Sequence, residues 1–303
     1  MLKISSIFIL STFLSLASSS YAQNLDGVKP PTAKEIKALA AKLASQQQKF
    51  EATSWSSNHP KEKLQTFDNF IARTVRPNPK LNTIYIQQIG DLTKSQEKVI
   101  DAVCEFLQVF FNSPVKRLDP VGLNAIPQNA RRTHPQWGDK QILTSYVLNN
   151  ILLPKRPKDA IAVLGLTTSD LWPGEGWNFV FGQASLVERV GIWSLYRYGN
   201  PDTDEASYLK FLLRALKVAL HETGHMYGIE HCISFRCCMN GSNSLPETDD
   251  APLAFCSECS AKIWYRTGVD PNEWFEKLAK LAGKYELKKE AEYWKKSAEL
   301  LGK

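Results

Sequence analysis

Histidines are few in this chain and concentrated in one short stretch. Three of the five lie in the run HETGHMYGIEHC, residues 221–232. His221 and His225 are four residues apart, so on a helix both rings lie on one face and can bind one metal ion. Glu222 lies between them, where it can take a proton from a metal-bound water. The pattern predicts a zinc site with Glu222 as the general base.

A third histidine follows at a spacing that requires a turn. Gly228 can adopt positive φ without steric cost, so it can end the helix and bend the chain back. That turn brings His231 toward the other two rings as a third ligand. Three neutral imidazoles leave the open position that a catalytic zinc needs. H-E-x-x-H alone occurs by chance on polar helix surfaces, whereas the extended motif with Gly228 and His231 is far more restrictive.

Five of the six cysteines follow directly, between Cys232 and Cys259. Their spacing predicts a four-thiolate structural zinc site. The proposed ligands are Cys232, Cys237, Cys256 and Cys259. Two alternatives stay open, because export permits disulfides and buried thiols can also be free. Cys238 is either a buried residue or a replacement for Cys237 as ligand.

Together these residues resemble the signature of the archaemetzincin (archaelysin) family of zinc metallopeptidases, in the metzincin clan. The resemblance covers His221 to Cys259 and includes Met239, shortly after the second cysteine. It implies a compact α/β domain with a mixed sheet, a long active-site helix and a zinc-bound C-terminal subdomain. It further implies two zinc ions, one catalytic and one structural. Met239 would occupy the Met-turn beneath the catalytic metal.

The elements that must position these residues follow from periodicity. Leucines at helical spacing predict a long helix over 204–227, with the motif at its end. Segment 113–138 lacks periodicity and is expected to be a loop, and 51–80 is expected to be a polar surface excursion. Strands alternating with helices indicate an α/β sandwich with a mixed sheet. Strands are expected at 82–90, 160–167, 178–186 and 190–198, and further helices at 94–111 and 140–153.

The ends of the chain carry their own signals. Residues 1–22 contain an apolar run followed by small residues and are expected to be a cleaved signal peptide. We expect an N-terminal helical extension over 23–75, a catalytic domain over 76–268 and a C-terminal helical hairpin over 269–303. Gly283 is expected to separate the two hairpin helices, whose apolar stripes predict packing against the domain.

Composition supports a globular chain: 43% of residues are apolar, and 37 basic residues stand against 31 acidic ones. This dispersed charge does not indicate nucleic-acid binding. The sequence therefore predicts a secreted zinc-dependent metallopeptidase, in which Glu222 assists attack of zinc-bound water on a peptide bond. We expect export to the periplasm or the medium and a monomer without a stable membrane anchor.

The expected substrate is a peptide or protein bound in extended conformation. By resemblance, it would pair with an edge strand of the sheet, for which 178–186 is the candidate. The alternative function is a non-catalytic, zinc-stabilised binding module with a blocked cleft. The presence of Glu222 argues against that alternative, because a purely structural site has no use for it.

Overall fold

The computed structural model describes residues 30–74, 78, 80–185 and 187–302. The predicted signal peptide, residues 1–22, lies outside these described residues. Within them, no helix combines the length and the apolar character that crossing a membrane requires. The predicted division of the chain into four parts stays a prediction.

A mixed five-stranded sheet forms the centre of the molecule, with strand order β2-β1-β5-β8-β7. The first four strands of this order run parallel, whereas β7 pairs antiparallel with β8 at the sheet edge. A smaller sheet has the order β3-β4-β6. The strands are β1 (Thr83–Ile89), β2 (Val115–Val121), β3 (Arg131–Thr133), β4 (Lys140–Leu143), β5 (Ala160–Thr167), β6 (Asp170–Trp172), β7 (Gly182–Ser185) and β8 (Val190–Ser194).

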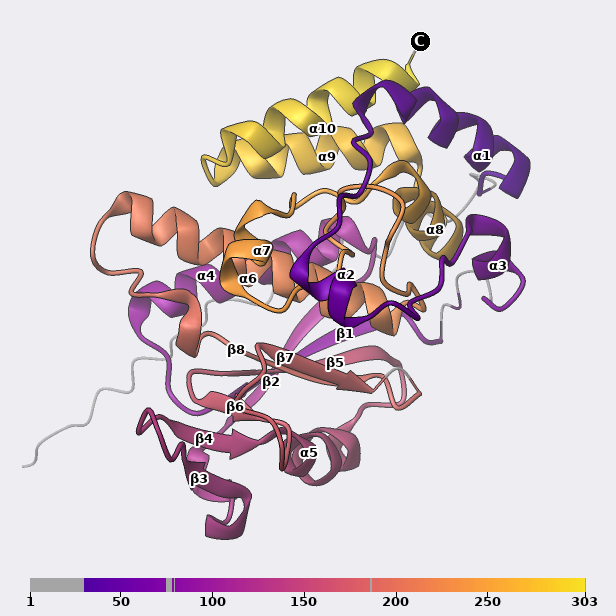
Figure 1. Ribbon diagram of the computed structural model, residues 1–303. Helices are drawn as coiled ribbons and strands as arrows, with labels where there is room; N and C mark the ends of the chain where they lie inside the picture. Colours follow the sequence, from indigo (N-terminus) through magenta and orange to yellow (C-terminus); the bar gives the residue numbers. More distant parts are fainter. Residues whose placement is uncertain (1–29, 75–77, 79, 186, 303) are drawn as a thin grey trace, which may run out of the picture.

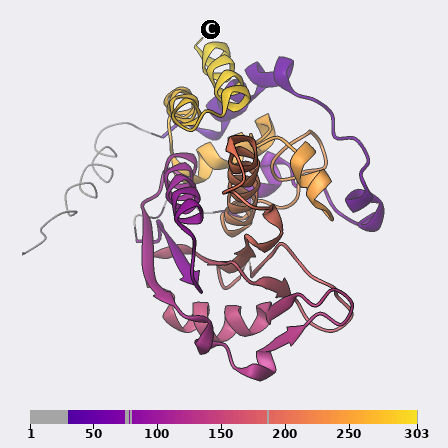
Figure 2. The same cartoon turned by 90° about the vertical axis from the view of Figure 1, so that its left-hand side faces the viewer.

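Helices cover both faces of the central sheet (Figure 1). α4 and α6 lie on one face, and α5 with the π-helical turn after it, Val147–Leu152, lies on the other. Above α4 and α6, α9 and α10 add a further layer (Figure 2). The α-helices are α1 (Ala33–Lys42), α2 (Ser54–Asn58), α3 (Phe67–Ile71), α4 (Lys94–Phe110), α5 (Thr144–Tyr146), α6 (Glu205–Met226), α7 (Leu245–Asp250), α8 (Ser257–Thr267), α9 (Pro271–Lys284) and α10 (Lys288–Leu301).

The alternation of side chains along β1 explains this layering. Ile84 and Ile86 join the core that faces α4 and α6, whereas Tyr85 and Ile89 join the core on the opposite face. Every residue of β5 is buried, as expected for a central parallel strand covered on both sides. The predicted fold class, an α/β sandwich with a mixed sheet and a long active-site helix, is confirmed.

Helix α6 is the element that presents the histidines. Asp204 caps its N-terminus, because the Asp204 carboxylate accepts a hydrogen bond from the Ser207 backbone N–H at 2.7 Å. Leu212, Leu216 and Leu220 are fully or almost fully buried and hold the helix against the core. Because this apolar face fixes the rotation of the helix, it also fixes the direction in which the polar motif at its end points.

Several predicted elements are confirmed in kind, although their ends shift. β1, β5, α4 and α6 match the predicted strands and helices within about two residues, an ordinary uncertainty for element ends. Segments 178–186 and 190–198 do pair with each other, but as the shorter strands β7 and β8.

Two sequence predictions are wrong in the region before β5. Segment 113–138 contains β2, which pairs with β1 and whose side chains are half-buried or exposed. An edge strand of this kind has no apolar alternation to detect. The predicted helix over 140–153 begins with β4 instead, because Gln141–Leu143 pair with β6 in the smaller sheet.

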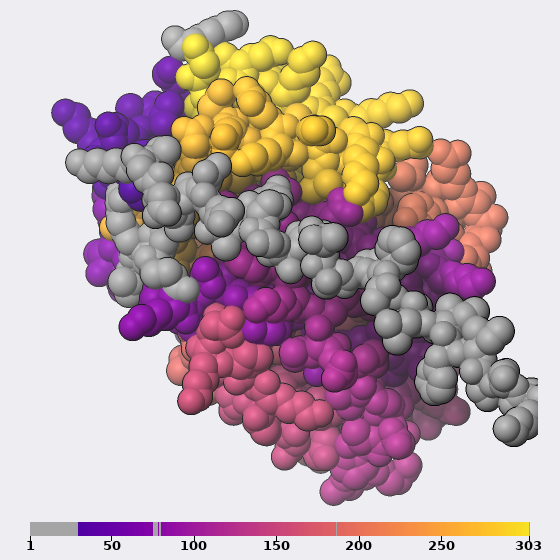
Figure 3. Space-filling model, turned by 180° about the vertical axis from the view of Figure 1, so that it is seen from behind, coloured from indigo at the N-terminus to yellow at the C-terminus, as the bar shows by residue number. Residues whose placement is uncertain are grey.

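The expectation of a polar surface excursion over 51–80 is confirmed only in part, because most of its described residues are exposed or half-buried but a few are not. Trp55, Phe67 and Phe70 are almost fully buried, and Phe67 and Phe70 belong to the main core. Helix α1 lies beside the C-terminal helices (Figure 3), where the Lys42 ammonium donates to the Leu301 carbonyl at 3.0 Å. The buried apolar residues of 51–80 are too few and too irregularly spaced to form a periodic pattern, which is why their burial leaves no signal in the sequence.

At the C-terminus, α9 and α10 form the predicted helical pair. Trp274 and Trp294 are buried, which confirms that the apolar stripes pack against the rest of the molecule. The predicted break at Gly283 is wrong, because this glycine lies within α9. The chain reverses instead at Glu286, which adopts φ of 58°.

Candidate metal centres

The end of α6 brings the first two motif histidines together. Their ring centroids are 4.5 Å apart, and their Nε2 atoms are separated by 3.0 Å. This proximity follows from the four-residue spacing, since residues i and i+4 lie on the same helical face. His221 and His225 therefore present two imidazole nitrogens to one point.

Gly228 delivers the third histidine by the predicted turn. Its φ is +91°, and α6 ends two residues before it, at Met226. After this turn, the His231 ring lies 4.7 Å from that of His225, centroid to centroid. One ligand atom from each of the three histidines lies within 4.8 Å of the other two.

Each imidazole is held from its far side by a hydrogen bond from Nδ1. His221 Nδ1 lies 2.8 Å from the Cys238 carbonyl, and His225 Nδ1 lies 2.7 Å from the Ile229 carbonyl. For His231 the partner is a carboxylate, Glu62 Oε1, at 2.9 Å. Because a carbonyl only accepts, the first two rings carry their protons on Nδ1 and turn their Nε2 lone pairs inward.

These converging lone pairs fit a metal cation. Two Nε2 acceptors 3.0 Å apart repel each other unless a positive ion lies between them. Burial and the neighbouring imidazoles lower the pKa of His221 well below its ordinary value, and burial chiefly lowers that of His225 to about 4. Both rings are therefore neutral near pH 7, which is the form that binds zinc.

Glu222 lies beside this cluster, between α6 and the sheet edge. A Cβ added to Gly182 in β7 would lie 3.2 Å from Glu222 Oε1, so the edge strand passes directly over the carboxylate. Withdrawal from solvent raises the pKa of Glu222 to about 7. Sequence analysis did not single out Gly182, although a glycine within an expected strand is a signal of close approach.

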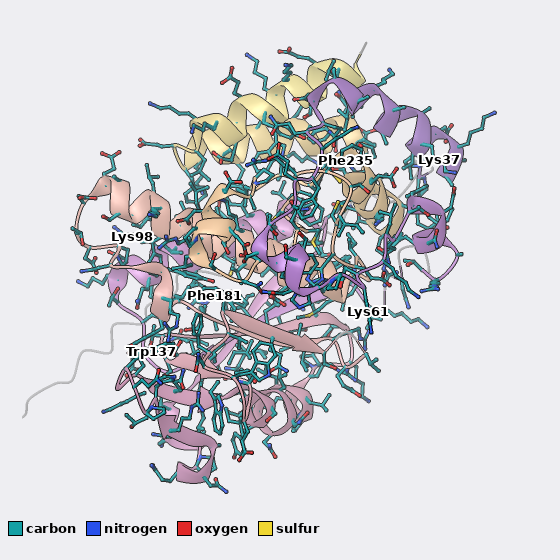
Figure 4. All side chains as sticks on the ribbon, viewed as in Figure 1. Lys37, Lys61, Lys98, Trp137, Phe181 and Phe235 are labelled. Carbon is teal, nitrogen blue, oxygen red and sulfur yellow. The ribbon has the colours of Figure 1, made fainter. Side chains whose placement is uncertain are left out.

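A cavity of about 90 Å³ opens next to Glu222 and His221. Phe181 lines one side of it, and Figure 4 shows this residue between the sheet and α6. Val218 and Thr248 line other parts of the wall. The arrangement places an acid–base group, a candidate metal centre and a partly apolar recess side by side.

The four predicted cysteine ligands form a second, buried cluster. Their sulfur atoms all lie within 4.8 Å of one another, and Cys232 Sγ is 3.7 Å from Cys256 Sγ. Sulfurs bound tetrahedrally to one zinc at about 2.3 Å stand roughly 3.8 Å apart, whereas a disulfide needs about 2.05 Å. All six cysteines are free thiols in the structure. The geometry therefore favours a four-thiolate metal site over disulfides.

Comparisons with known proteins agree with this geometry. The model of peptidase family M54 matches residues 156–264. Archaemetzincin-2 of Pongo abelii is 34% identical over 260 residues, covering 75% of this chain and 71% of that protein. The chain belongs to the archaemetzincin family. It is thus a zinc metallopeptidase, a hydrolase, and the alternative of a non-catalytic binding module is not supported.

Other relatives cover less of the chain. An archaemetzincin from Pyrococcus abyssi is 40% identical over 129 residues, which is 41% of this chain and 66% of that protein. A solved archaemetzincin from Archaeoglobus fulgidus is 27% identical, with a TM-score of 0.47, and covers 59% of this chain and 99% of that chain.

The two remaining residues singled out in the sequence, Met239 and Cys238, are both buried. Met239 is fully buried, and its sulfur would lie 2.5 Å from a Cβ added to Gly224 on α6. Met239 thus packs directly beneath the helical turn that carries His225. Cys238 is buried apart from the cysteine cluster, with its thiol 3.4 Å from the Lys217 carbonyl, so it does not replace Cys237.

We expect Gly228→Val to weaken zinc binding at the histidine cluster more than it lowers the stability of the fold. Valine at φ of +91° costs on the order of 1–3 kcal/mol, which the local chain can relieve by moving His231 away. Zinc affinity measured by chelator competition should fall, with a smaller relative change in thermal stability. Gly228→Asn is the matched control, because asparagine tolerates positive φ better. Unchanged affinity in the valine variant would contradict this role of the turn.

Proposed function

We propose that this archaemetzincin is an exported peptidase that holds its catalytic zinc with His221, His225 and His231. Glu222 is the general base of the reaction. The observation that carries this proposal is the convergence of three imidazoles beside Glu222, at the mouth of a cavity.

The histidines and Glu222 have different roles in the proposed hydrolysis. When bound, zinc supplies a Lewis acid that acidifies water and polarises a carbonyl. Hydrogen bonds at Nδ1 keep the three rings in the tautomer that offers Nε2. Glu222 accepts the proton of the attacking water at a carboxylate oxygen and gives it to the leaving amine nitrogen.

The substrate is a peptide in extended conformation, laid antiparallel or parallel along β7. This strand is at the edge of the sheet and passes over Glu222, so main-chain pairing there brings a peptide carbonyl to the acid–base group. The cavity lined by Phe181 and Val218 accepts one partly apolar substrate side chain.

A second zinc ion is structural and bound by Cys232, Cys237, Cys256 and Cys259. The pKa of Cys232 is lowered by hydrogen bonds from the neighbouring thiols, chiefly the thiol of Cys237. A lowered pKa favours the thiolate form that a metal requires. Four thiolates close a tetrahedral site, so this ion has no open position for catalysis.

Export is proposed from the sequence of residues 1–22 alone. The apolar run and the small residues before Gln23 are typical of a cleaved signal peptide. The mature chain then works in the periplasm or the medium, as a monomer without a stable membrane anchor.

The test is to express the chain with its own leader and assay the exported fraction on unfolded peptides. We expect the mass of a mature chain that begins at Gln23. Hydrolysis should stop when zinc is removed and resume when zinc is added back. Cleavage that continues in the metal-free protein would contradict the catalytic proposal. An intact leader in the cell interior would contradict export and leave the catalytic proposal standing.

A further inference from the structure

Residues 53–65 contact α7 and the candidate catalytic centre at the end of α6. Figure 1 shows this segment, which contains α2, running from α1 across the active-site helix toward α3. Lys61, labelled in Figure 4, marks its course. Three side chains of the segment reach the loop that carries His231, and each does so by a different kind of contact.

Trp55 provides the first contact. Its indole ring lies edge-on to the His231 imidazole, with centroids 4.7 Å apart, and only 4% of the residue is exposed. A Cβ added to Gly241 would lie 1.9 Å from the indole, so Trp55 fills the space that this glycine leaves. The backbone N–H of Trp55 donates to Glu247 at 3.2 Å, which ties the segment to α7.

Gln65 provides the second contact and holds the loop on both sides of its turn. Its Nε2 donates to the Gly228 carbonyl at 2.9 Å, and its Oε1 accepts from the Glu230 backbone N–H at 3.1 Å. The buried Lys262 ammonium donates to the same Oε1 at 3.0 Å. Both polar atoms of this buried amide are therefore hydrogen-bonded, and together they fix the segment against the loop and against α8.

Glu62 provides the third contact, at the imidazole itself. Its Oε1 lies 2.9 Å from His231 Nδ1, and both side chains are less than a third exposed, at 28% and 29%. The other two motif histidines use backbone carbonyls of their own region for this purpose, Cys238 and Ile229. A carboxylate partner fixes the ring orientation and increases the basicity of the nitrogen that faces the metal.

We propose that Glu62 is the positioning residue of the third zinc ligand, and that residues 53–65 are an integral part of the catalytic centre. The inference rests on the proposed function, because it takes His231 as a ligand. Trp55 and Gln65 hold the segment in place, and Glu62 then keeps the His231 ring turned toward the rings of α6. A chain from which these residues were removed would lose the hydrogen-bond acceptor of its third ligand.

The test compares Glu62→Ala, Glu62→Gln and the control Glu51→Ala, an exposed glutamate of the same region. The full-length mature protein is titrated with zinc against a chelator, and Co²⁺ is substituted at the histidine site for its absorption spectrum. Loss of an outer hydrogen-bond partner typically costs about 10- to 100-fold in metal affinity. We expect Glu62→Ala to lose this much at the histidine site and to change the Co²⁺ spectrum.

Glu62→Gln keeps an acceptor oxygen without the charge, so its affinity should lie between those of Glu62→Ala and the wild type. Glu51→Ala should match the wild type, and the cysteine-site zinc should be retained in all three variants. Wild-type affinity and spectrum in Glu62→Ala would overturn the proposal. If Glu62→Ala unfolds and loses both ions, the Glu62→Gln variant decides the question. Wild-type zinc affinity in Glu62→Gln would then overturn the proposal.

His231→Ala separates this inference from the proposed function on which it rests. It should abolish tight zinc binding at the histidine site. If it did not, the ligand set itself would be wrong. If it did, and Glu62→Ala bound zinc like the wild type, only the positioning role of Glu62 would fail.

Discussion

Glu222→Gln should abolish most peptide hydrolysis while leaving zinc in place. Glutamine has the size of glutamate, so it fits beneath β7 where Gly182 leaves room for the side chain. Its amide cannot accept the proton of the attacking water, and loss of a general base typically costs about 10² to 10⁴ in rate. Zinc content should be unchanged, because the three histidines and their hydrogen bonds are not altered. Turnover of an unfolded peptide and metal analysis on the same sample check both statements.

Glu205→Gln is the matched control for this variant. Glu205 lies in the first turn of the same helix, far along α6 from the motif, and carries the same chemical change. It should hydrolyse peptides like the wild type. A Glu222→Gln enzyme as fast as that control would exclude Glu222 as the general base.

Cys256→Ser should release one zinc ion per chain and destabilise residues 232–259. Cys256 lies at the start of α8, and its backbone N–H donates to Cys237 Sγ at 3.2 Å. The metal and this hydrogen bond together hold α8 against the loop that carries Cys237. Binding energy at a structural zinc contributes directly to folding. We expect a loss of at least about 3 kcal/mol, roughly a 5 °C fall in Tm for a chain of this size. Metal stoichiometry, thermal unfolding and hydrogen exchange measure the three effects.

Activity should fall in the same variant although Cys256 touches no catalytic residue. The backbone N–H of Cys232 donates to the Met239 carbonyl at 2.8 Å. The cysteine region therefore links the neighbour of His231 to Met239, which packs against Gly224 of α6. Cys238→Ser is the matched control, since that thiol contacts the Lys217 carbonyl outside the cluster. It should keep both zinc ions. One zinc per wild-type chain, together with no alkylatable thiols, would contradict the four-thiolate site.

Sequence alone could predict the two metal clusters because their geometry is set within short stretches of chain. The spacing of His221 and His225 fixes their relation once the segment is helical, and a glycine at the right place is enough to return His231. The apolar face of α6 could be predicted equally well, since apolar residues recur at helical spacing along a long amphipathic helix. The resemblance to archaemetzincins, drawn from these same residues, indicated the family that the comparisons then showed.

Tertiary structure alone decided what surrounds those clusters. Glu62 is 169 residues from His231 in the chain, and no local pattern pairs a carboxylate with a distant imidazole. Gly182 meets Glu222 only because β7 pairs with β8 at the edge next to α6. Trp55 is buried within a polar-looking segment for the same reason, since its partners His231, Gly241 and Glu247 are remote from it in the chain. Short-range periodicity determines how a helix or a turn presents its own residues, whereas contacts between remote segments depend on the packing of the whole core.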